Sequence, residues 1–123
     1  MRKSFDEILR NLNGYISIED FDQLIYEGGK YISDISGDYE YEIISDYINR
    51  FSKLNLDGII IKDNILYLKV SSLDLPIENY LSNLQYLLLG IRISLNISKS
   101  YSVSSLFYDT LKDNYISVLT FNL

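Results

Sequence analysis

The segment from Gly58 to Val70 constrains the fold most strongly. Two runs rich in β-branched and aromatic residues, Gly58 to Lys62 and Ile65 to Val70, are separated by Asp63 and Asn64. Both of these residue types tolerate a positive φ, and a two-residue loop of this kind favours a type I′ turn. The sequence therefore predicts an antiparallel hairpin over 58–70, around which the remaining elements must pack.

Helical patterns precede the hairpin. Ser4 followed by Glu7 forms a capping box, and Gly14 supplies a stop for this first helix. Ser17 caps a second helix that we expect from Ile18 to Glu27, ended by a pair of glycines. A third helix is expected from about Asp38 to Leu54, and the segment 30–37 is left open. The apolar spacing behind these predictions is i, i+3, i+4, and it places Leu9, Ile44 and Ile48 in the core.

The second half is predicted to hold one further helix and more of the sheet. That helix begins near Asp74, has Pro76 in its first turn, buries Leu84 and ends at Gly90. Alternation of apolar and polar residues predicts strands over 91–97, with Ile93 in the core, and over 115–121. For the segment 101–112 we favour a short helix over 104–112 to a strand.

These elements give a single α+β domain over residues 1–123. In it the N-terminal helices pack on a small, mostly antiparallel sheet made of the hairpin 58–70 and strands 91–97 and 115–121. A length of 123 residues fits one domain. The longest apolar run is too short to cross a membrane, and we expect no membrane association.

Missing residue types exclude much chemistry. The chain has no Cys and no His, so the usual zinc, copper and haem ligands and the commonest general base are lacking. Gly28-Gly29-Lys30 lacks the first Gly and the Ser/Thr of a phosphate-binding loop. The segment from Asp34 has neither the Gly nor the Glu spacing of an EF-hand, which leaves a polar turn or an adventitious cation site. We expect no enzymatic activity, no catalytic residues, no metal and no cofactor. A chain without Cys fits a reducing cytoplasm.

Charge is distributed unevenly along the chain. Nine acids and one base, Lys30, lie between Glu19 and Asp46, whereas no acid lies between Glu78 and Asp109. The acids can be solvated helix faces that match the helix dipoles, or they can form a binding surface for a basic partner. In the second interpretation, two tyrosines among the acids act as contact residues or belong to the core. The candidate partner-binding residues are Asp34, Asp38, Tyr39, Glu40, Tyr41, Glu42 and Asp46.

Two classes of function are compatible with this pattern. The first is a small acidic inhibitor of a basic protein, most concretely an immunity protein against a nuclease-type toxin, or a phage or viral inhibitor that mimics nucleic-acid charge. The second is a structural or assembly subunit that forms homo-oligomers through its sheet. The acidic balance argues against direct binding of nucleic acid, which requires a basic surface. No motif indicates the partner or the oligomeric state.

Overall fold

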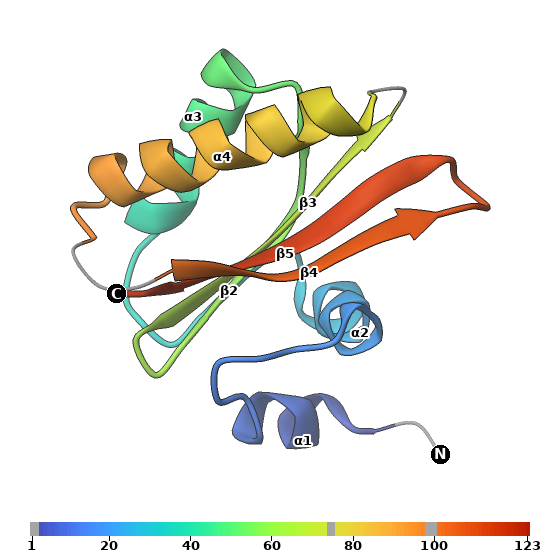
Figure 1. Ribbon diagram of the computed structural model, residues 1–123. Helices are drawn as coiled ribbons and strands as arrows, with labels where there is room; N and C mark the ends of the chain where they lie inside the picture. Colours follow the sequence, from blue (N-terminus) through green and yellow to red (C-terminus); the bar gives the residue numbers. More distant parts are fainter. Residues whose placement is uncertain (1–2, 74–75, 98–100) are drawn as a thin grey trace.

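A five-stranded sheet forms the centre of the protein, with two helices on each face (Figure 1). The computed structural model describes residues 3–73, 76–97 and 101–123. The strand order is β1-β2-β3-β5-β4, and all pairs are antiparallel except β1 with β2. Helices α3 and α4 cover one face, and α1 and α2 cover the other (Figure 1). The elements in chain order are α1 (Phe5–Arg10), α2 (Ile18–Gly28), β1 (Tyr31–Ser33), α3 (Tyr39–Phe51), β2 (Asn55–Lys62), β3 (Ile65–Leu73), α4 (Ile77–Ser94), β4 (Tyr101–Asp109) and β5 (Asn114–Asn122).

The expected hairpin is confirmed as β2 and β3, and it supplies the middle of the sheet. Asp63 and Asn64 have φ values of 53° and 63°, the left-handed conformation that a type I′ turn needs. Helices cover both faces, so successive side chains of β2 enter different cores. Ile59 and Ile61 pack against α3 and α4, whereas Ile60 packs against α1 and α2. An uninterrupted apolar run therefore suits this strand better than strict alternation.

The first two helices begin where their caps predict. The Ser4 hydroxyl accepts a hydrogen bond from the backbone N–H of Glu7 at 3.1 Å, and Ser17 accepts one from Asp20 at the same distance. Gly14 has a φ of 110°, and its N–H donates to the hydroxyl of the buried Tyr67 at 2.8 Å. Capping and burial together hold both helices against the sheet. Leu9 is only half-buried at the edge of this core.

The largest correction concerns the end of α4. Residues 91–97 are not a strand, because the helix continues through Gly90 to Ser94. Ile91 and Leu95 are also four residues apart, so the apparent alternation fits a helix as well. Leu84 and Ile91 are buried, but Ile93 faces away from the sheet and is 69% exposed. Asp74, the expected start of the helix, lies outside the described residues.

Two further segments differ from the sequence-based expectation. The stretch 101–112 forms the edge strand β4 and a turn, so the helix expected over 104–112 is wrong. Within the open segment 30–37, Tyr31–Ser33 forms β1 and pairs in parallel with β2. A strand of three residues is too short to show any periodicity. Helix α3 ends at Phe51 rather than near Leu54; it buries Ile44 and Ile48 as expected.

Gly90 has a packing role instead of ending its helix. A Cβ built on Gly90 would lie 1.9 Å from Cζ of Tyr47, so the absence of a side chain makes room for that ring. The Tyr47 hydroxyl donates to the backbone oxygen of Tyr86 at 3.1 Å, and its ring packs on Phe51 at 5.1 Å between centroids. This contact fixes α3 against α4.

Candidate partner-binding surface

The acidic segment 19–46 does not form one continuous surface. Its first part lies on α2 and its second part on α3, and these helices cover opposite faces of the sheet (Figure 1). On α2, Asp20 pairs with Lys3 at 3.3 Å, and Asp22 pairs with Lys69, whose side chain is almost fully buried. These two carboxylates therefore have partners within the chain, and the exposed Glu19 and Glu27 lie at opposite ends of α2. Helix α3 carries the denser group of exposed acids and is the candidate surface.

One side of α3 carries an exposed row of carboxylates. Asp38, Glu42 and Asp46 are spaced at i, i+4 and i+8 and are all exposed; we call them the acidic stripe. Asp46 accepts a hydrogen bond from Arg50 at 2.8 Å, while Asp38 and Glu42 form no ion pair with any residue that the structure describes. Asp38 is the N-cap residue of α3, but its side chain makes no capping hydrogen bond. Two of the three carboxylates are thus available to an external cation.

The two tyrosines beside the stripe have different environments. Tyr39 is 61% exposed and extends the stripe, whereas Tyr41 is half-buried and packs against the core between the sheet and α3. The Tyr41 ring lies 5.3 Å from that of Tyr31, whose hydroxyl donates to the backbone oxygen of Gly37 at 3.2 Å. These contacts hold the start of α3 against β1. Tyr39 is the better candidate for a partner contact.

Asp34 and Glu40 do not belong to the stripe. The Asp34 carboxylate is exposed but accepts a hydrogen bond from the backbone N–H of Asp63 at 2.9 Å, so it supports the β2–β3 turn. Glu40 is half-buried, and its Oε2 is buried with no hydrogen-bond partner among the described residues. Of the seven candidate residues, the structure brings together Asp38, Tyr39, Glu42 and Asp46 on the exposed side of α3.

A polar cavity of about 490 Å³ lies beside the stripe. The neighbouring side of α3 contributes Tyr41, Ser45 and Asn49, and the Ser45 hydroxyl is buried without a hydrogen-bond partner among the described residues. The start of β2 contributes Asp57, and Lys30 adds one positive charge. The cavity is therefore lined by a carboxyl group, an ammonium group and amides at the border of an acidic surface.

Asp57 is the residue that sequence patterns missed. It lies at a β-bulge, where the register of β2 shifts between Leu56 and Gly58. Burial raises the pKa of its carboxyl group above the usual value. The Ser71 hydroxyl donates a hydrogen bond to this group at 3.1 Å, which lowers the pKa and offsets part of that rise. A cation that entered the cavity would stabilise the ionised form. The only signal in the sequence is an acid directly before Gly at the edge of an apolar run.

The described residues include no group of three acids that could hold a metal ion. Across the same residues, no helix has the length and apolar character needed to cross a membrane.

No family model matches the sequence, and no curated protein or solved structure is significantly similar to it. Any functional conclusion must therefore come from the surface itself. Exposed carboxylates beside a polar cavity are suited to binding ammonium and guanidinium groups.

Proposed function

We propose that this chain is a small acidic inhibitor that binds a basic protein through α3. The observation that carries the proposal is the acidic stripe, in which Asp38 and Glu42 are exposed without an ion-pair partner among the described residues. The most concrete form is an immunity protein that neutralises a nuclease-type toxin in the cytoplasm. A phage or viral inhibitor that mimics nucleic-acid charge would use the same surface. The chain itself acts as a binding protein without catalysis or cofactor.

Two parts of the surface have different roles in this proposal. The stripe attracts a basic partner over a distance, because clustered charges of one sign accelerate encounter. The cavity then receives one Lys or Arg side chain of the partner, which pairs with Asp57. Tyr39 supplies an apolar contact at the border, as Tyr does in many interfaces. The formal net charge of −6 opposes direct binding to nucleic acid.

Capture from a lysate of the native host tests the proposal with two matched variants. The stripe variant carries Asp38→Asn, Glu42→Gln and Asp46→Asn. The control variant carries Asp6→Asn, Glu27→Gln and Glu78→Gln, three exposed acids outside α3. Each variant loses three negative charges, so their formal net charges are equal.

Wild-type and control proteins should retain the same basic protein, and the stripe variant should lose it. For a nuclease toxin, equimolar wild-type protein should also abolish cleavage of DNA or RNA by the captured partner. Equal capture by all three proteins would reject the stripe as the site. Equal loss with both variants would show that only the net charge matters.

A further inference from the structure

Among the strands that the structure describes, β4 forms one edge of the sheet and pairs only with β5. It has nine residues, whereas the strand at the opposite edge, β1, has three. A long edge strand presents a row of backbone N–H and C=O groups that can pair with another strand. Natural proteins often protect such edges with Lys or Pro, and β4 contains neither. A bulge interrupts β4 between Val103 and Ser105, and Asp109 is its single charged residue.

The part of β4 after this bulge is apolar and exposed. Leu106, Phe107 and Tyr108 are 48%, 51% and 43% exposed, which is unusual for three consecutive large residues in a strand. Cross-strand pairing with β5 places Leu106 and Tyr108 on the α4 side of the sheet and Phe107 on the α2 side. Apolar surface therefore borders the open edge on both faces.

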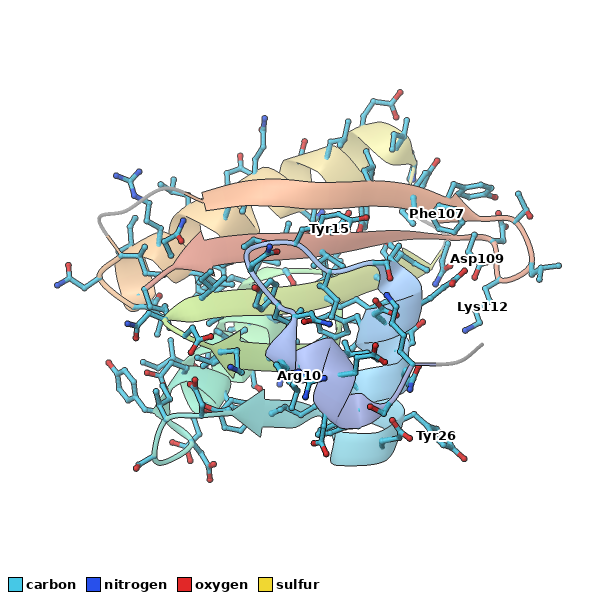
Figure 2. All side chains as sticks on the ribbon, turned by 90° about the horizontal axis from the view of Figure 1, so that it is seen from below. Arg10, Tyr15, Tyr26, Phe107, Asp109 and Lys112 are labelled. Atoms are coloured by element: carbon cyan, nitrogen blue, oxygen red, sulfur yellow. The ribbon has the colours of Figure 1, made fainter. Side chains whose placement is uncertain are left out.

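Each face also has a groove along this edge. On the α4 side, Leu81, Leu84 and Leu88 face Leu106 around a groove of about 400 Å³. On the α2 side, Tyr15 and Ile18 face Phe107 around a groove of about 520 Å³, and Figure 2 shows Tyr15 and Phe107 on the same side near β4. A strand added to β4 would place alternate side chains into both grooves.

Charge indicates which strand can occupy the edge. No acid lies between Glu78 and Asp109, although the chain as a whole has a formal charge of −6. Helix α3, which carries the acidic stripe, packs over β2 and beside α4. Three strand spacings separate β2 from β4, which is about 14 Å and exceeds the screening length of about 8 Å at physiological salt. Two copies can therefore approach through β4 while their acidic stripes stay apart, and the acids near this edge include Glu19 in the groove on the α2 side and Asp109 at the end of β4.

We propose that a second copy of this chain pairs its β4 with β4 in antiparallel orientation, about a two-fold axis at Phe107. The bulge interrupts the strand before Ser105, so the regular segment is Ser105 to Asp109 and Phe107 is its centre. In this register Phe107 lies opposite Phe107 of the second copy, and Leu106 lies opposite Tyr108. These central pairs are apolar, which favours the pairing, and Ser105 lies opposite Asp109 at the ends of the segment. The two sheets join into one of ten strands, and both acidic stripes remain free for other partners.

Sedimentation equilibrium on the purified chain tests the dimer, with Phe107→Lys as the disruptive variant and Leu111→Lys as its control. Leu111 is 95% exposed in the turn after β4. Wild type and control should form dimers with micromolar affinity, and Phe107→Lys should weaken association at least about 100-fold. A wild-type protein that is monomeric at about 1 mM, or a variant that dimerises like wild type, would overturn the proposal. Equal thermal midpoints and circular dichroism spectra establish that both variants fold.

Cysteine cross-linking tests the register in a chain that has no cysteine of its own. In an antiparallel pair, opposite Cα atoms lie about 4.5–5.5 Å apart, which is within the range for a disulfide. Phe107→Cys should form a covalent dimer on mild oxidation. Tyr26→Cys, at an 85% exposed position on α2 far from β4 in Figure 2, should not. Equal cross-linking of the two variants, or none at Phe107→Cys in a proven dimer, would refute the register.

Discussion

Replacement of Gly90 by Ala should destabilise the protein, although Ala favours a helix. The substitution lies inside α4, where helix propensity alone would stabilise the protein by about 1 kcal/mol. The new Cβ would lie 1.9 Å from Cζ and 2.1 Å from the hydroxyl oxygen of Tyr47. The ring must therefore leave its position on α4.

The displaced ring loses two interactions that the structure shows. Its hydroxyl loses the 3.1 Å bond to the backbone oxygen of Tyr86, worth about 1 kcal/mol. Its contact with Phe51 contributes about 0.5–1.5 kcal/mol, and crowding a packed interface costs about 1–3 kcal/mol. After the gain in helix propensity, we expect Gly90→Ala to lower the free energy of unfolding by about 1.5–4.5 kcal/mol.

A double-mutant cycle with Tyr47→Ala isolates this cause, measured by urea unfolding and circular dichroism. Once the ring is removed, Gly90→Ala should stabilise the protein by about 1 kcal/mol. The effect of the same substitution thus changes sign between the two backgrounds. Stabilisation in the wild-type background, or a coupling energy below about 0.5 kcal/mol, would refute the packing role of Gly90.

Three further predictions concern the interior and the cavity. Burial raises the pKa of Tyr80 from 10.0 to about 12, so its neutral form contributes about 3 kcal/mol of stability below pH 10 that is lost between about pH 10 and 12. In urea unfolding across this pH range, the free energy of unfolding should fall less for Tyr80→Phe than for the wild-type protein. An equal fall in both proteins would contradict this prediction. Because burial raises the pKa of Asp57, Asp57→Asn should raise the thermal midpoint at pH 7 and have little effect near pH 3; a lower midpoint at pH 7 would mean that the carboxylate is stabilised within the chain. In chemical unfolding, Ile48→Ala should lower the free energy of unfolding by about 2–5 kcal/mol and Ile93→Ala by less than about 0.5 kcal/mol, because Ile48 is buried and Ile93 is exposed. Similar losses for the two variants would place Ile93 in the core.

Features fixed by neighbouring residues could be predicted from the sequence. The turn at Asp63 and Asn64 and the caps at Ser4 and Ser17 depend on backbone preferences and hydrogen bonds within a few positions. The exposed carboxylates on α3 follow from helical spacing. Each of these features is determined before any distant part of the chain packs.

The features that could not be predicted depend on distant contacts. Glycine commonly ends helices. Gly90 instead lies within α4, and the reason is visible only from the ring of Tyr47, which occupies the space beside it. β1 exists because Tyr31 to Ser33 can pair with β2. The division of the acidic segment between two faces, and the burial of Asp57 at a bulge, follow from how the chain crosses the sheet. Local patterns contain none of this information.

The association rate with the captured partner, at low and high salt, tests the proposed acidic surface most directly. Stopped-flow measurements at about 50 mM and 500 mM salt compare the wild-type protein, the stripe variant and the control variant. We expect fast, strongly salt-dependent association for wild type and control, and at least about tenfold slower, weakly salt-dependent association for the stripe variant at low salt. Thermal midpoints should differ little, because exposed ion pairs contribute about 0–1 kcal/mol each. Equal slowing of both variants, or no slowing of the stripe variant, would contradict the proposal that Asp38, Glu42 and Asp46 guide a basic partner to α3.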